Sequence, residues 1–74
     1  MAKGDEIETL GTALPAEMKR VRDELMPMYQ SIGPSGQFAL VLMRRELDVA
    51  TKALAEGDVI QMLRSYEGLK AFQE

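Results

Sequence analysis

The segment Phe38-Ala-Leu-Val-Leu-Met43 places six apolar residues in a row near the middle of the chain. It follows Ile32-Gly-Pro-Ser-Gly36, whose glycines and proline are typical of a tight turn. After this turn, apolar residues recur at intervals of three and four, which is the spacing of one helix face. The segment therefore predicts a helix over about residues 36–56 that begins directly after a chain reversal.

The predicted helix 36–56 carries two apolar stripes. The first comprises Leu40, Met43, Leu47, Ala50 and Leu54. The second comprises Phe38, Leu42, Val49 and Ala53. A helix that is apolar on two sides is covered from two sides. A chain of 74 residues builds only one small core, so we expect one stripe to face that core and the other to face a second copy of the chain.

Helical spacing also precedes the turn and predicts a helix over about 14–31. Its apolar stripe comprises Leu10, Leu14, Met18, Val21, Leu25, Met28 and Ile32. Pro15 suits the first helical position, where its missing N–H costs nothing, so residues 1–9 are expected to be a loose N-terminal segment. Pro27 predicts either a kink near residues 23–26 or an early helix end, and the sequence leaves both open.

Turn and capping residues set the remaining boundaries. Gly33 suits a positive φ, and Ser35 suits the N-cap of helix 36–56. Gly57 suits a helix C-terminus, and Asp58 with Gln61 has the spacing of a capping box. A third helix is predicted over about 58–72, with an apolar face of Val59, Met62, Leu63, Tyr66, Leu69 and Phe72. The predicted fold is one all-α domain over 1–74, a helical hairpin plus a third helix, assembled as a homodimer.

The charged residues fall largely into pairs four apart, as on solvated helix faces. The expected pairs are Lys19–Asp23, Arg20–Glu24, Arg44–Asp48, Asp48–Lys52 and Lys52–Glu56. A chain with a net charge of −3 lacks the positive electrostatic field that attracts nucleic acid. Binding of nucleic acid is therefore disfavoured.

Composition disfavours several other functions. The chain has no Cys and no His, so disulfides and Cys/His zinc sites are excluded, and its serines lack an activating histidine. We expect no enzyme activity, no catalytic, cofactor-binding or metal-binding residue, and no small-molecule substrate. No apolar run approaches the ~20 residues that cross a bilayer, and acids near the N-terminus do not fit a secretory leader. We therefore expect a cytoplasmic protein without membrane contact.

The candidate binding residues are apolar side chains outside the expected core. Phe38, Leu42 and Val49 are predicted to lie in the dimer interface. Met26 and Tyr29 flank Met28, which belongs to the apolar stripe of helix 14–31, and Met and Tyr are favoured at interfaces. We expect Met26 and Tyr29 to be exposed anchors for a partner.

The stretch IGPSGQFALVLMRRELDVATKALAEGDVIQMLRSYEGLK, residues 32–70, resembles short proteins of bacteriophage and prophage genomes, including Mu-like phages. The likeness lies in the I-G-P-x-G turn, the long apolar helix, and the ALAEGD turn into a final R-x-Y-E-x-L-K helix. This resemblance implies no catalytic residues. It implies a phage-encoded protein that binds and diverts a host protein in the host cytoplasm.

The leading functional prediction is a non-enzymatic interaction protein, phage-encoded, that binds and modulates or inhibits a host protein. A dimeric DNA-binding transcriptional regulator is the first alternative. A virion or assembly component is the second, and it predicts higher-order assembly in place of a closed dimer.

Overall fold

The computed structural model describes the backbone of residues 3–73 and the side chains of residues 10–73. Its elements are α1 (Lys3–Arg20), the π-helical turn η1 (Val21–Leu25), α2 (Met26–Ser31), the 3-10 turn η2 (Gly33–Gly36), α3 (Gln37–Glu56) and α4 (Val59–Ala71). Over residues 3–73 there is no strand, so the predicted all-α class is confirmed.

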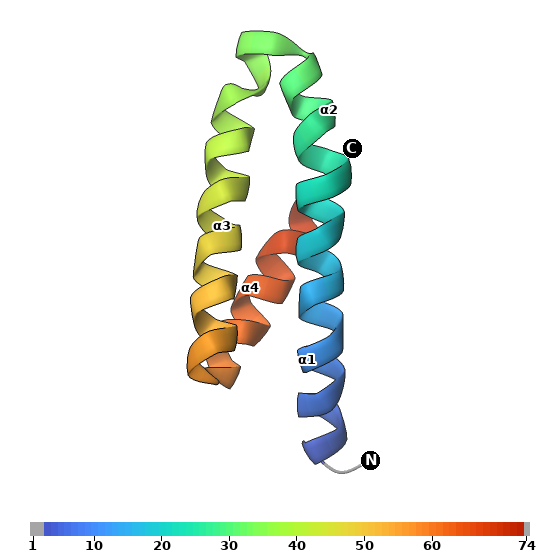
Figure 1. Cartoon of the computed structure of the whole chain (residues 1–74), viewed down its shortest axis with the longest axis vertical. Coiled ribbons are helices and arrows are strands. Elements are labelled where there is room, and N and C mark those ends of the chain that lie inside the picture. The colour runs from blue at the N-terminus through green and yellow to red at the C-terminus, as the bar shows by residue number, and fades with distance from the viewer. Residues whose placement is uncertain (1–2, 74) are drawn as a thin grey trace.

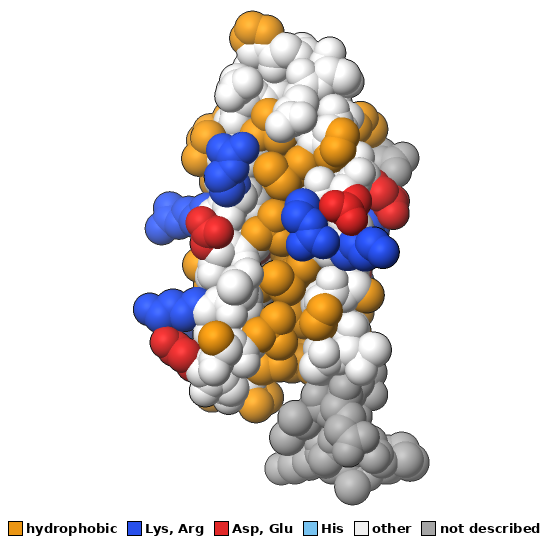
Figure 2. Space-filling model, viewed as in Figure 1, with side chains coloured by type: hydrophobic (Ala, Val, Ile, Leu, Met, Phe, Trp, Pro, Cys, Tyr) orange, Lys and Arg blue, Asp and Glu red, His pale blue; other side chains and the backbone are white. Residues whose placement is uncertain are grey.

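The helices form a hairpin with a third helix packed across one side (Figure 1). α1, η1 and α2 follow one another as a single rod, η2 reverses the chain, and α3 returns beside the rod. α4 packs against α3 and α1 in the half of the molecule away from η2. The molecule measures 45 × 20 × 15 Å. On the side seen in Figure 2, apolar side chains show along the seam between the two long helices, with charged side chains along both edges.

The first helix begins earlier than expected. α1 is already helical at Lys3, so the expectation of a loose segment over 1–9 is wrong for residues 3–9. Residues 1 and 2 lie outside the described part of the chain. Pro15 therefore sits inside the helix rather than at its first position. Leu14 is fully buried and Leu10 packs against the same core, so side-chain burial offsets the hydrogen bond that Pro15 cannot donate.

Pro27 does not end the first helix. The turn immediately before it is π-helical, and the N–H of Met26 donates to the carbonyl of Val21 five residues earlier. A π-turn inserts one residue into the helical ladder. The insertion lies where Pro27 supplies no donor and crowds the carbonyl four residues earlier. The helix then continues as α2 to Ser31, so the early end that the sequence left open does not occur.

The reversal at η2 depends on its two glycines. Gly33 has a φ of 75°, the positive value expected for it. A Cβ atom on Gly36 would lie 2.2 Å from the carbonyl oxygen of Tyr29, so only glycine fits this crossing. The expected N-cap is wrong, because the hydroxyl of Ser35 donates to the carbonyl of Ile32 at 3.2 Å. The residue that precedes α3 is Gly36, which has no side chain to cap the helix.

The second turn follows the expected capping pattern in part. Gly57 has a φ of 68°, and the N–H of Asp58 donates to the carbonyl of Ala53 at 3.0 Å. The carboxylate of Asp58 accepts from the backbone N–H of Gln61 at 3.1 Å. The amide of Gln61 donates to the hydroxyl of Ser65 at 3.2 Å, not back to Asp58. Only one half of the predicted capping box is therefore present.

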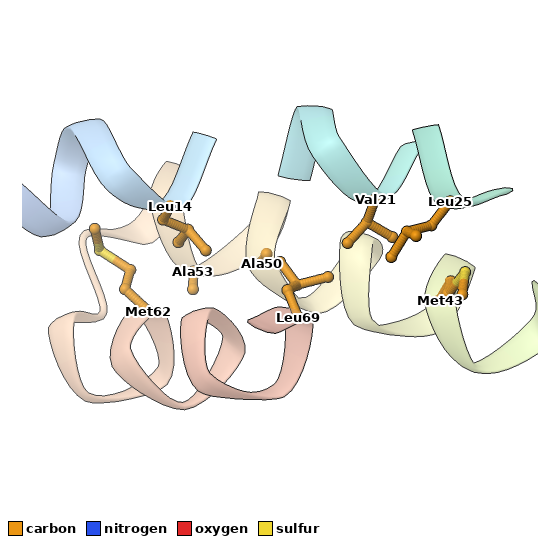
Figure 3. Close-up of a cluster of buried hydrophobic side chains, with 8 residues drawn as sticks. All are labelled: Leu14, Val21, Leu25, Met43, Ala50, Ala53, Met62 and Leu69. Atoms are coloured by element: carbon orange, nitrogen blue, oxygen red, sulfur yellow. The ribbon is translucent and has the colours of Figure 1, made fainter. Parts of the chain in front are cut away.

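The core fills the space where the three helices meet (Figure 3). Its buried members come from all three helices and comprise Leu14, Val21, Leu25, Met43, Ala50, Ala53, Met62 and Leu69. The first stripe of α3 faces this core as expected, with Leu47 and Leu54 half-buried at its edge. Ala53, which we assigned to the outward stripe, belongs to the core instead, because α4 covers that flank of α3.

Gly36→Ala is expected to lower the free energy of unfolding by about 2 kcal/mol, because the added methyl group collides with backbone rather than with a movable side chain. Gly11→Ala is the matched control. Gly11 lies in α1 with nothing within 4 Å of an added Cβ, so this change should stabilise the protein by about 0.5–1 kcal/mol. Urea unfolding followed by circular dichroism measures both. Equal stability of the two variants would contradict the close crossing.

Candidate protein-binding surfaces

The first candidate surface is the outer apolar face of α3, which we define as Phe38, Val41, Leu42 and Val49. Phe38 is 75% exposed, Val41 55% and Leu42 38%, and Val49 is half-buried. The structure thus brings the three predicted interface residues of α3 onto one side of the helix, away from the core. Val41 was missed because it lies outside the stripe spacing used to read the sequence.

Met26 and Tyr29 do not lie on this face. Both are half-buried and pack against the core cluster, so the expectation of two exposed anchors is wrong. The hydroxyl of Tyr29 donates to the carbonyl of Gln73 at 2.7 Å. This bond ties the segment after α4 to α2, and it gives Tyr29 a role in holding the fold.

The second candidate surface is an exposed patch at the start of α4, which we call the α4 patch and define as Val59, Ile60 and Leu63. Ile60 is 68% exposed, and the other two are also exposed. The sequence placed Val59 and Leu63 on the core face, which is wrong. The buried line of α4 is Met62, Ser65 and Leu69. Ser65 is the signal that was overlooked: its hydroxyl accepts from Gln61, so it can be fully buried within the bundle.

The exposed charged side chains of α3 form no ion pair with residues 10–73. Two ion pairs occur among residues 10–73, Arg20–Glu17 and Arg22–Asp23. None of the five pairs that we predicted four residues apart is formed there. Exposed ion pairs gain little energy in water, which is why such ladders need not form. On α3 the exposed charges without an ion pair to a described residue are therefore Arg44, Arg45, Asp48, Lys52 and Glu56.

Arg20 links α1 to the end of α4. Its guanidinium pairs with the carboxylate of Glu17, and its Nη2 donates to the carbonyls of Leu69 and Phe72, at 3.0 Å each. The last carbonyls of a helix lack partners within that helix. Arg20 therefore caps the C-terminal end of α4 from α1, and this contact fixes how α4 crosses the hairpin.

The described residues offer few features of a chemical site. Among them no group of three or more acidic, Cys or His side chains is placed to hold a metal ion. No described helix combines the length and apolar character that crossing a bilayer requires. The two apolar surfaces are therefore the features from which function can be argued.

Comparison with protein-family models, with curated proteins and with solved structures found no match. The resemblance to phage proteins over residues 32–70 therefore stays a prediction.

Arg20→Met is expected to lower the free energy of unfolding by about 1–3 kcal/mol, because it removes the donor to the Phe72 carbonyl, one of the two donors to the Leu69 carbonyl, and the partner of the Glu17 carboxylate. The matched control is Arg22→Met, which removes only an exposed pair with Asp23 and should change stability by less than about 0.5 kcal/mol. Thermal and urea unfolding of both variants measure the difference. An Arg20 variant as stable as the control rules out the capping role.

Proposed function

We propose that this chain is a non-enzymatic interaction protein, phage-encoded and homodimeric, that binds and modulates a host protein. The single observation that carries the proposal is the 75% exposure of Phe38 beside the exposed Val41 and Leu42. Scattered exposed apolar residues are ordinary, but a contiguous apolar group on one face marks an interaction site. The resemblance to phage proteins supports the host protein as target.

The amount of exposed surface supports self-association. The chain exposes 5093 Å², whereas a compact monomer of its mass exposes roughly 4500 Å². The excess of several hundred Å² accompanies the elongated shape of the molecule, 45 × 20 × 15 Å. An elongated small chain covers less of its apolar surface by itself than a compact one does. Without Cys or metal ligands of the Cys/His type, a second copy is the remaining support for so small a core.

The two apolar surfaces suit two different partners. The outer apolar face begins next to η2, whereas the α4 patch lies at the other end of the hairpin (Figure 1). We assign the outer apolar face to the second copy and the α4 patch to the host protein. One surface per partner allows a dimer to form without blocking the binding of its target.

DNA binding is the second candidate, and one observation favours it. Arg44 and Arg45 are exposed and have no acidic partner among residues 10–73. Against it, the exposed acids Asp48 and Glu56 share α3 with them, and Asp58 stands at the start of α4. A gel-shift at about 50 mM salt separates the candidates, because phosphate contacts give salt-sensitive binding to any DNA. The absence of a shift dismisses the regulator.

Leu42→Glu is expected to convert the dimer to a monomer at micromolar concentration while the helical circular dichroism signal is kept. The reason is that a carboxylate buried in the interface lacks a partner there, while in the single chain Leu42 is already partly exposed. Arg44→Glu is the control and should remain dimeric, since Arg44 is not part of the outer apolar face. Light scattering gives the mass of each. A monomeric wild type removes the dimer, and a mass well above a dimer favours the assembly component.

Host binding is tested with the α4 patch. The wild-type protein as bait is expected to enrich one host protein. The double variant Ile60→Ser, Leu63→Ser is expected to lose this protein, because it removes the apolar contact without changing any buried side chain. The Leu42→Glu variant is the companion bait and keeps the α4 patch. Recovery of the same proteins by the wild type and by the Ile60, Leu63 variant counts against the assignment.

A further inference from the structure

We propose that two copies of α3 pack antiparallel through the outer apolar face, with Arg45 of each copy opposite Asp48 of the other. This inference rests on the homodimer in the proposed function, and it adds the direction of packing. The occupant of the outer apolar face is thus a second copy of this chain. The argument comes from the distribution of charge along α3.

The two halves of α3 carry opposite charge. The half that follows η2, residues 37–46, has Arg44 and Arg45 against one carboxylate, Glu46, which lies beside Gly68 of α4. The other half, residues 47–56, has Asp48 and Glu56 against the single cation Lys52. Parallel packing of two α3 helices sets like charges beside each other, whereas antiparallel packing sets the basic half against the acidic half. Opposite charges across an interface favour the correct orientation and disfavour the wrong one.

Helical geometry places the charges beside the apolar residues. Residues on a helix are separated by about 100° around the axis, and about 18 residues make about five turns. Glu56 follows Phe38 by that interval, so both lie along the same side of α3. Arg45 falls on this side between Leu42 and Val49, whereas Arg44 points about 100° away. Arg45 therefore borders the outer apolar face, and its neighbour in sequence does not.

An antiparallel pair of α3 helices, centred on the middle of α3, both covers the outer apolar face and pairs the opposite charges beside it. Arg45 then faces Asp48 and Val49 of the second copy, and the twofold symmetry repeats the contact. Phe38 lies across from Glu56, so the apolar start of each α3 covers the end of the other. The shared length from Phe38 to Glu56 is about 27 Å. Arg45 and Asp48 are exposed and make no ion pair with any residue of 10–73, so both are free to pair between copies.

Charge reversal tests the direction of packing. Arg45→Glu and Asp48→Arg are made separately, with Arg44→Glu as the matched control. All three positions are exposed on one helix, so circular dichroism should show an unchanged fold. Dimer dissociation constants are measured by sedimentation equilibrium at low and high salt, for each variant alone and for the equimolar mixture of Arg45→Glu with Asp48→Arg.

The expected result is a self-association weakened about 10-fold or more for each of the two variants, because both symmetry-related pairs change from attraction to repulsion. Their mixture recovers wild-type strength. In the mixed dimer the carboxylate introduced at position 45 meets the guanidinium introduced at position 48, and the native Arg45 of one copy meets the native Asp48 of the other. High salt reduces the differences. The Arg44→Glu control keeps the wild-type constant.

Three results overturn the inference. The first is a mixture that associates no better than its components, and the second is an Arg44→Glu variant as weak as Arg45→Glu. The third is Arg45→Glu associating best with the wild type, which indicates parallel packing with Arg45 facing Arg45. In each case a dimeric wild type leaves the proposed function standing. A monomeric wild type overturns the homodimer as well, and points to a different protein as the occupant of this face.

Discussion

Helix α3 is apolar around more of its circumference than a chain of 74 residues can cover, and most of the structure follows from this constraint. The side of α3 that carries Met43, Ala50 and Ala53 faces the core, where it packs against α1 and α4. No further helix of the described chain remains for the opposite side. Phe38, Val41 and Leu42 are consequently left in water when the chain is alone. Burying a large apolar side chain contributes about 1.5–3 kcal/mol, so this exposure favours association.

Close backbone contacts and a few hydrogen bonds stabilise this small fold, which has no Cys and therefore no disulfide. Gly36 lets the hairpin close against the carbonyl of Tyr29, and Gly57 turns the chain into α4. Arg20 then binds the end of α4, and Tyr29 binds the residue beyond Phe72. The contacts of Arg20 and Tyr29 join segments far apart in the sequence. They fix the angle at which α4 crosses the hairpin, and this crossing decides which flanks of α3 stay open.

The sequence predicted the elements better than it predicted their faces. Capping residues and glycines act locally, so the turns at Gly33 and Gly57 and the extents of α3 and α4 could be read from neighbouring residues. Which of two adjacent apolar flanks is covered depends on the position of α4, which no local pattern contains. Ala53 was therefore placed outside the core and Leu63 inside it, both wrongly.

The prolines and the charged pairs were also predicted from local patterns that do not contain the tertiary packing. Pro15 was expected to begin a helix and Pro27 to kink or end one. The helix instead continues through both, because packing of Leu10 and Leu14 offsets the missing bond at Pro15 and a π-turn precedes Pro27. The predicted charge ladder did not form, because single exposed pairs are too weak to order long side chains. Phe38 and Leu42 could be placed on a separate face because their spacing differs clearly from that of Leu40 and Met43. Met26 and Tyr29 could not, since a partly apolar side chain beside a core stripe can turn either way.

The central claim is that the outer apolar face of α3 is covered by a second chain in solution. Hydroxyl-radical footprinting read at Phe38, with the half-buried Phe72 as internal reference, measures this most directly. The account predicts that Phe38 is protected at micromolar concentration and becomes more reactive than Phe72 on dilution, as dimers dissociate. A Phe38 side chain that reacts rapidly at every concentration, as its 75% exposure in the single chain implies, contradicts the claim.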